Sequence, residues 1–177
     1  MQESLDLVGQ LSKEIRTLSY LLHPPLLDET GLSEALRWYL QGLAERSDLK
    51  IRLGVSENLG RVSSDLELAV FRVVQECLTN IHRHSGSKTA TVALSRDEDT
   101  LSLEIDDEGQ GISPQRLAKI RAQHSGVGIT GMRERIRCLG GTFDIQSDGR
   151  GTKISVTFPI SKDVGREEEK AQAQSAR

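Results

Sequence analysis

Apolar residues near the start of the chain recur at alternating steps of three and four, which is the spacing of one seam along a helix. The positions on this seam are Leu5, Val8, Leu11, Ile15, Leu18 and Leu22. The spacing predicts a helix of a bundle or coiled coil, or else an ordinary amphipathic helix, and Pro24-Pro25 end it. A second helical pattern opens at Thr30-Gly31 and carries leucines at positions 32, 36, 40 and 43.

Alternation of apolar and polar positions, typical of half-buried strands, marks five later stretches of the chain. They are residues 49–55, 88–94, 100–106, 142–147 and 152–159. Short polar or glycine-rich turns separate the second stretch from the third and the fourth from the fifth. Each of these two pairs is therefore predicted to form a hairpin.

Helical patterns fill the intervals between these strands. Ser64 and Glu67 predict a capping box that opens a helix running to about His84. The apolar face of that helix consists of Leu66, Val70, Val73, Cys77 and Ile81. Ser113-Pro114 begins a short helix, and a last helix is expected from about Thr130 to Leu139. Residues 122–128 between them are small, polar and glycine-rich, so we expect them to be mobile.

This order of elements predicts an α/β fold, a two-layer sandwich of a mixed sheet of about five strands with helices on one face. Residues 161–177 are charged and carry no apolar face, which predicts a disordered tail. With 3% aromatic residues the core must be aliphatic, and a net charge of −3 provides no basic footprint for direct nucleic acid binding.

The two cysteines and the lengths of the apolar runs indicate the cellular compartment. Cys77 and Cys138 form neither a CxxC motif nor a disulfide framework, which favours a reducing cytoplasm. No apolar run approaches the roughly 18 residues that span a bilayer, and the first ten residues show no signal-peptide pattern. We therefore expect a cytoplasmic chain, or the cytoplasmic part of a soluble or membrane-bound parent.

Candidate chemistry begins on the helix from Ser64. Glu76, Asn80 and His84 are spaced four residues apart on one face, and Arg72 extends the row backward. A carboxylate one turn from a carboxamide is a plausible oxygen site for Mg²⁺, which takes few protein ligands and keeps several waters. The alternative is a solvated polar helix face.

Three glycine motifs follow. Asp107-x-Gly109-x-Gly111 stands at a strand end, where glycines let the backbone approach a ligand and Asp107 can accept from an exocyclic amine. Gly126-x-Gly128-x-x-Gly131 leads into a helix, a potential anion site, but no apolar strand precedes it, which excludes a dinucleotide-binding fingerprint. Gly149-x-Gly151-Thr152 closes the series. The alternative for the first and last motifs is a tight turn.

Taken in order, these motifs resemble the N, G1, G2 and G3 boxes of the family that unites histidine kinases, gyrase B, MutL and related chaperone ATPases. FRVVQECLTNIHRHSG is similar to the N box of the branch related to nitrate sensors and DegS-like kinases, and GVGITGMRERIRCLGG to its short G2 segment. LLHPPLLDETGLSEAL resembles the junction between the dimerisation helix and the catalytic domain. The resemblance covers residues 65–160, and more loosely extends back to residue 12.

The resemblance implies a Bergerat-type ATP-binding fold with ATP and Mg²⁺ as ligands. Asn80 would ligate Mg²⁺, and Glu76 would act as catalytic base or hold a metal-bound water. Asp107 would bind the adenine amino group, Gly109 and Gly111 would admit the base, and Thr152 would support the pocket. The nucleotide lid and its phosphate-facing end would comprise Gly126, Gly128, Ile129 and Gly131. His84 matches a basic position of the N box.

The resemblance also implies a domain plan and partners. Residues 1–27 would be the end of a dimerisation helix and its junction, 28–160 the catalytic domain and 161–177 a tail. The activity would be that of a protein-histidine kinase of a two-component system, homodimeric through its dimerisation helices and serving a response regulator with a helix-turn-helix output.

One departure limits the implied activity. No His followed by Asp or Glu opens a long helix, and His23 lies against two prolines, so we expect no autophosphorylation of the isolated chain. The alternatives are a serine kinase of the anti-sigma-factor type and a non-catalytic nucleotide-binding module.

Overall fold

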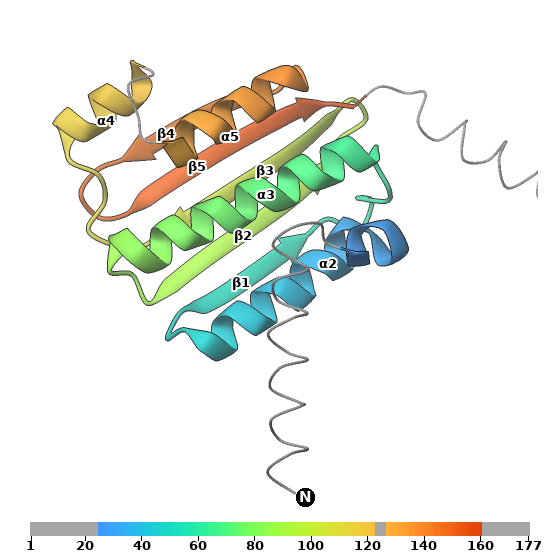
Figure 1. The fold of residues 1–177 in the computed structure, drawn as a ribbon, viewed down its shortest axis with the longest axis horizontal. Coiled ribbons are helices and arrows are strands. Elements are labelled where there is room, and N and C mark those ends of the chain that lie inside the picture. Colours follow the sequence, from blue (N-terminus) through green and yellow to red (C-terminus); the bar gives the residue numbers. More distant parts are fainter. Residues whose placement is uncertain (1–24, 123–126, 161–177) are drawn as a thin grey trace, which may run out of the picture.

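The computed structural model describes residues 25–122 and 127–160, and it confirms the predicted fold class. The helices that it describes lie on one face of a five-stranded mixed sheet (Figure 1). The helix expected over residues 5–22, His23, Gly126 and the tail from residue 161 lie outside the described residues.

The strands follow the predicted stretches to within two residues. They are β1 (Lys50–Val55), β2 (Thr89–Arg96), β3 (Thr100–Asp107), β4 (Thr142–Ser147) and β5 (Thr152–Pro159). Their order in the sheet is β1-β2-β3-β5-β4. β1 pairs with β2 in parallel, and the other neighbours are antiparallel. Both predicted hairpins form, β2 with β3 and β4 with β5.

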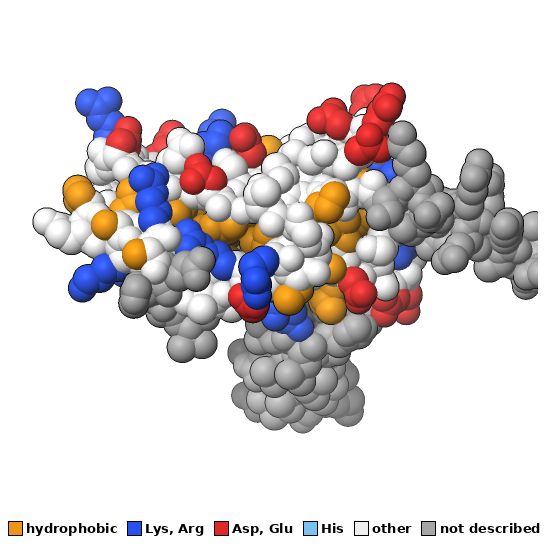
Figure 2. All heavy atoms as spheres, turned by 90° about the horizontal axis from the view of Figure 1, so that it is seen from above, with side chains coloured by type: hydrophobic (Ala, Val, Ile, Leu, Met, Phe, Trp, Pro, Cys, Tyr) orange, Lys and Arg blue, Asp and Glu red, His pale blue; other side chains and the backbone are white. Residues whose placement is uncertain are grey.

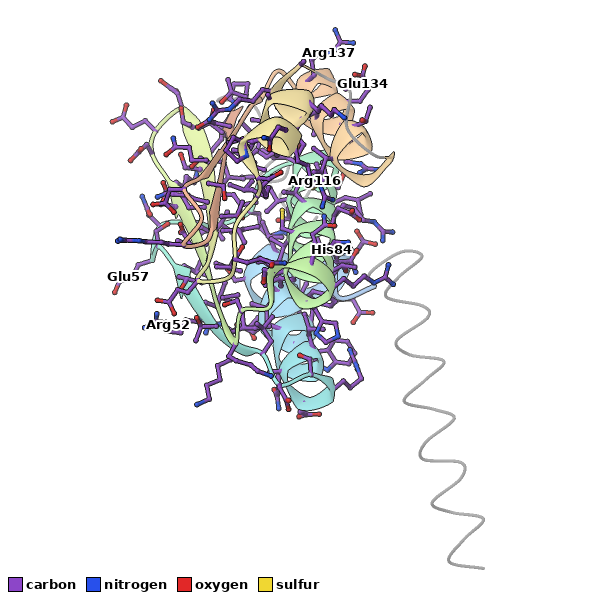
Figure 3. All side chains as sticks on the ribbon, turned by 90° about the vertical axis from the view of Figure 1, so that its left-hand side faces the viewer. Arg52, Glu57, His84, Arg116, Glu134 and Arg137 are labelled. Atoms are coloured by element: carbon purple, nitrogen blue, oxygen red, sulfur yellow. The ribbon has the colours of Figure 1, made fainter. Side chains whose placement is uncertain are left out.

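Alternation along the strands separates a buried face from an open one. In β3, Leu101, Leu103 and Ile105 are buried, and the residues between them are half-buried or exposed. Val92 of β2 and Val156 of β5 lie on the same buried face. Figure 3 shows the sheet nearly edge-on with the helices on one side of it. Burial of these aliphatic side chains is the main favourable contribution to folding.

Five helical segments are described. They are α2 (Pro25–Arg46), α3 (Ser64–Asn80), the π-helical turn η1 (Ile81–Ser85), α4 (Pro114–Arg121) and α5 (Val127–Cys138). α3 packs between α2 and α5 (Figure 1). Phe71 of α3 is fully buried and meets the Tyr39 ring of α2 at a centroid distance of 5.5 Å.

The chain bends within α2. Gly31 has φ 82° and ψ 175°, which is not helical, so a short first turn and a longer helix meet there. A non-glycine residue rarely adopts such a φ. The predicted opening of a helix at Thr30-Gly31 is therefore confirmed at the level of the backbone.

The predicted capping box at Ser64 is wrong. Ser63 is the N-cap, and its carbonyl accepts from the Leu66 and Glu67 amides, both at 2.9 Å. Glu67 is buried, and the Arg61 Nε atom donates to its carboxylate at 2.9 Å. A buried carboxylate requires a charged partner, and here the preceding loop provides one.

The predicted helix ends also need correction. The helix from Ser64 continues to Ser85, but its last turn is π-helical and Gly86 ends it with φ 69°. α5 begins at Val127 and not at Thr130, so Gly128 lies within the helix, as Gly131 was already predicted to do. The stretch that we expected to be mobile is therefore helical from residue 127 onward.

Charge is mixed over the surface. In the view of Figure 2, Lys and Arg side chains are interspersed with Asp and Glu side chains. Within residues 25–122 and 127–160, no helix is long and apolar enough to cross a bilayer.

Candidate functional site

A cavity of about 600 Å³ lies at the end of β3, between the sheet and the helices. Segments from α3, η1, the 107–113 loop, α4, α5 and the β4–β5 hairpin line it. Its apolar lining consists of Cys77, Ile81, Ile105, Ile112, Pro114, Ile120, Ile129, Met132, Ile145 and Ile154. A mostly apolar cavity with a few convergent polar groups is the usual form of a small-ligand site.

Asp107 is the buried acidic group of this cavity, which the exposed Asp148 also lines. Asp107 continues the buried positions of β3, so strand alternation directs it toward the helices, and the side chain is 8% exposed. The Gly109 amide donates to its Oδ1 atom at 2.8 Å, and Thr152, its partner in β5, donates through its side chain and its backbone. Burial raises the pKa of the Asp107 carboxyl, and the hydrogen bonds from Gly109 and Thr152 oppose this rise.

Gly109 is required by the protein's own packing. A Cβ atom there would lie 2.6 Å from the Ser85 Cβ and closer still to the Ser85 carbonyl oxygen. That carbonyl accepts from the Gln110 amide at 2.8 Å, which joins the 107–113 loop to η1. Gly109 does not line the cavity, and its packing against Ser85 gives it a structural role. That it also admits the ligand stays a prediction. Gly111, with φ 68°, does line the cavity.

The β4–β5 turn closes the cavity from the other side. The Ser147 hydroxyl donates to the Gly151 carbonyl at 2.6 Å and accepts from the Ile112 amide at 2.8 Å. A Cβ atom on Gly151 would collide with the Asp107 carbonyl oxygen, so glycine allows the hairpin to approach β3. Ser147 lines the cavity and was not predicted, because its partners come from two distant segments.

Asn80 of α3 lines another wall of the cavity, one helical turn from Glu76, which does not line it. The Asn80 Nδ2 atom donates to Glu76 Oε1 at 3.2 Å. Since this bond uses the amide nitrogen, the Asn80 carbonyl oxygen is left as a hard oxygen donor of the kind that Mg²⁺ accepts. No cluster of three or more His, Cys, Asp or Glu side chains that could hold a metal occurs within the part of the chain that the structure describes. The Asn80 oxygen fits a cation such as Mg²⁺, which takes few protein ligands.

His84 lies at the rim. It is exposed (Figure 3) and lines the cavity. Its backbone carbonyl accepts from Gln110 Nε2 at 2.8 Å. Because η1 is π-helical, His84 does not follow Asn80 at the spacing of an α-helix. Arg116 of α4 is a second rim residue that motif analysis missed.

Glu76 lines a second hollow, which we call the α3–α5 groove. It has a volume of about 350 Å³ and is lined by Arg72, Gln75, Glu76, Thr79, Gly128, Gly131, Met132 and Arg135. Gly128, in the first turn of α5, lies so close to Glu76 Oε1 that a Cβ atom would collide with it. Met132 belongs to both hollows, so the groove and the cavity are neighbours.

Nine of the eleven predicted site residues fall into two adjacent groups, while Gly109 lines neither hollow and Gly126 lies outside the described residues. The cavity brings together Asn80, His84, Asp107, Gly111, Ile129 and Thr152. The groove brings together Glu76, Gly128 and Gly131. Motif analysis missed Ile145 and Ile154 of the lining, for which the alternation along the last hairpin was the available signal.

A sandwich with this cavity defines the class of the protein. The model of the histidine kinase-, DNA gyrase B- and HSP90-like ATPase family matches residues 65–162, more than half of the chain, and the chain belongs to this ATPase family.

Particular relatives are sensor kinases. The chain is 30% identical over 151 residues to the sensor histidine kinase NarS of Mycobacterium tuberculosis (strain ATCC 25618 / H37Rv), a match that covers 85% of this chain and 35% of NarS. It is 32% identical over 155 residues to the sensor histidine kinase LiaS of Bacillus subtilis (strain 168), covering 87% of this chain and 41% of LiaS. The chain therefore spans well under half the length of these relatives.

Solved structures share the fold. The histidine kinase domain of the blue-light activated histidine kinase from Erythrobacter litoralis EL346 superimposes with a TM-score of 0.59 at 20% sequence identity. The superposition covers 75% of this chain and 60% of that one.

Proposed function

We propose that this chain is the catalytic ATP-binding domain of a two-component sensor histidine kinase. The observation that carries the proposal is a cavity that brings together the buried carboxylate of Asp107 and the Asn80 amide, which donates to Glu76, in a member of this ATPase family. The similarity to NarS and LiaS favours the histidine-kinase branch. The parent would be a homodimer with its kinase domain in the cytoplasm, and a response regulator with a helix-turn-helix output would receive the phosphoryl group.

Each wall of the cavity has a task in this proposal. The apolar lining holds the adenine ring, and Asp107 accepts a hydrogen bond from its exocyclic amine. Thr152 and Gly109 orient that carboxylate. The Asn80 oxygen would hold Mg²⁺, which when bound neutralises charge on the phosphates. His84, Gly111 and Ile129 complete the walls, and α5 would begin the lid that includes Gly126.

The reaction requires an acceptor histidine outside this chain. An imidazole nitrogen attacks the γ-phosphorus, the bond from this phosphorus to the β–γ bridging oxygen breaks, and ADP leaves. Glu76 would accept the imidazole proton, or orient a metal-bound water, from its place at the open groove beside Asn80. Positioning and charge stabilisation supply most of such catalysis.

The test is phosphoryl transfer in trans to a dimerisation domain that contains the acceptor histidine. Wild type should transfer label from γ-labelled ATP to give acid-labile phosphohistidine. Glu76→Gln should bind ATP almost as tightly as wild type does. It should transfer the γ-phosphoryl group about 10²–10⁴-fold more slowly, which is the usual contribution of a general base.

Two controls separate this proposal from its alternatives. The chain alone should remain unlabelled, and Glu134→Gln, a change on the exposed face of α5, should transfer at the wild-type rate. Acid-stable label on a serine would favour the anti-sigma-factor type of kinase. Binding without transfer to any acceptor would favour a non-catalytic nucleotide-binding module.

A further inference from the structure

The first turn of α2, residues 25–30, which we call the entry turn, is held by a side chain from a distant loop. The last carbonyls of a helix lack intrahelical N–H partners, and the non-helical backbone of Gly31 interrupts α2 directly after this turn. Arg61, from the loop between β1 and α3, donates to two of the carbonyls. Its Nη2 atom lies 3.3 Å from the Leu27 oxygen, and its Nη1 atom lies 3.5 Å from the Asp28 oxygen. A guanidinium at a helix C-terminus also interacts favourably with the helix dipole.

The same guanidinium is anchored to α3. The Arg61 Nε atom donates to Glu67 Oε1 at 2.9 Å, and the Glu67 side chain is 1% exposed while that of Arg61 is 42% exposed. The Val62 amide donates to the same oxygen at 3.5 Å. Since Glu67 is buried in the first turn of α3, this charge-assisted hydrogen bond fixes the guanidinium relative to that helix.

The rest of Arg61 is held as well. Arg96 of β2 donates from Nη1 to the Arg61 carbonyl at 3.0 Å and to the Leu59 carbonyl at 2.7 Å. On the other side, a Cβ atom at Gly31 would stand 3.1 Å from Arg61 Cδ, so glycine leaves room for the arginine stem. Arg61 therefore connects the sheet, α3 and the entry turn.

These contacts give the entry turn a fixed place relative to the cavity. Leu27 belongs to the main hydrophobic core, and Glu67 stands at the start of the helix that carries Glu76 and Asn80. The apolar seam of residues 5–22 joins the domain at this turn. An acceptor histidine attached through that segment would approach the nucleotide along a direction that the entry turn sets.

We propose that Arg61 is a positioning residue for the phosphoryl transfer. By joining the entry turn to Glu67, it sets the direction in which the segment before residue 25 leaves the domain. This inference rests on the proposed function, since it takes the acceptor histidine to be attached through residues 1–24. Arg61 lines neither the cavity nor the α3–α5 groove, so its effect is confined to an acceptor attached in this way.

The experiment measures transfer from γ-labelled ATP to the acceptor histidine in two arrangements. In the first the histidine is attached in the parent kinase, and in the second it is supplied in trans on a free dimerisation domain. Arg61→Met, which removes the donors, should slow transfer to the attached histidine by about 10- to 100-fold, as expected of a small misplacement of reacting groups. Transfer in trans and the affinity for ATP, measured by calorimetry, should stay within about twofold of wild type.

Two further variants act on the same contact. Arg61→Lys retains a positive charge for Glu67 but lacks the fork that reaches two carbonyls, so its rate with the attached histidine should lie between those of wild type and Arg61→Met. Gly31→Ala, which crowds the arginine stem and strains a φ of 82°, should also slow transfer to the attached histidine and not transfer in trans.

Hydrogen exchange tests the contact in the chain itself, without any acceptor. Amides of residues 27–34 should exchange about tenfold faster in Arg61→Met than in wild type, because local opening there loses its charge-assisted bonds. Exchange around Asn80 should be unchanged. The matched control is Arg52→Met, a change at an exposed arginine of β1, which should alter neither exchange nor transfer (Figure 3).

The outcomes separate the two proposals. If wild type transfers label in neither arrangement, the proposed function fails and this inference fails with it. If wild type transfers in both, and Arg61→Met is as fast as Arg52→Met with the attached histidine, the positioning role is wrong and the proposed function stands. Equal slowing in both arrangements, or unchanged exchange of residues 27–34, also overturns the positioning role. Should Arg61→Met fail to fold in thermal unfolding, Arg61→Lys decides by the same comparison.

Discussion

At the scale of single residues, Asp107 has opposite effects on stability and on binding. Strand alternation places its carboxylate in an apolar layer, where burial raises its pKa even though Gly109 and Thr152 donate to it. A ligand amine would supply the additional donor that water supplies in the unfolded chain. The buried carboxylate therefore lowers the stability of the folded protein, and it provides a hydrogen-bond acceptor for the ligand.

Replacing Asp107 by Asn should make the nucleotide-free protein more stable than wild type at neutral pH. With its pKa raised, the folded state binds this proton more tightly than the unfolded chain does. The contribution of Asp107 to the free energy of unfolding of the wild type is therefore lost as pH rises from the ordinary aspartate pKa through the raised pKa. Asn retains the Oδ1 acceptor for Gly109 without the charge. Denaturant titrations from about pH 3 to pH 8 measure the difference, which should grow with pH.

The same variant should bind ATP about 10- to 100-fold more weakly, because a charged acceptor of the amine is lost. Asp144→Asn, on the exposed side of β4, is the control and should change neither property. Parallel stability curves for wild type and Asp107→Asn across this pH range would contradict the role given to burial.

At the scale of elements, the contact between η1 and the 107–113 loop determines the shape of the cavity. The Ser85 carbonyl accepts from Gln110, and the Ser85 hydroxyl accepts from the Ser87 amide at 3.0 Å and donates to the Ile81 carbonyl at 2.9 Å. The π-helical turn thus presents its backbone to the loop at a distance that only glycine tolerates at position 109. Asp107 is held in place by this contact as well as by β5.

Gly109→Ala should destabilise the fold by about 1–3 kcal/mol, the usual cost of overpacking, because the new methyl group meets backbone that has little freedom to move. Gly131→Ala is the control. Its methyl group would stand in open space on α5, so that variant should be about 0.5–1 kcal/mol more stable than wild type. Urea unfolding of both variants is the measurement, and a Gly109 variant as stable as wild type would refute the close contact.

At the scale of the whole molecule, the cavity brings together parts of the chain that are far apart in the sequence. α3, the 107–113 loop, α5 and the last hairpin each provide a wall. A ligand that contacts all of them binds the folded state alone, so its binding free energy adds to the stability of the entire domain.

Mg²⁺-ATP at about 100 times its dissociation constant should stabilise the domain by about 2.7 kcal/mol. At the same ATP concentration, chelation of Mg²⁺ or the change Asn80→Ala should remove most of this gain, since both take away the cation contact. Glu76→Gln should keep it. Urea unfolding with and without ligand measures the gain, and hydrogen exchange should slow in α3 and α5 together. Equal stabilisation with and without Mg²⁺ would refute the metal role of Asn80.

The sequence by itself determined the layers and the face on which Asp107 lies. Alternation in β2, β3 and β5, and the apolar stripe along α3, depend on neighbours two to four residues away, so local spacing is enough to read them. For the same reason the Glu76–Asn80 pair, one helical turn apart, was predicted and forms a hydrogen bond.

Only the tertiary structure decided how distant segments meet. In the folded chain Glu67 pairs with Arg61 and does not cap the helix, and the end of the α3 helix is π-helical. Gly109 packs against Ser85, which is 24 positions away. The fold also brought Gln75 of α3 and Arg135 of α5 to the same groove, which no motif spans. These features depend on which side chains and backbone groups compete for the same space and the same hydrogen bonds once the helices pack on the sheet, and spacing along the chain does not encode that competition.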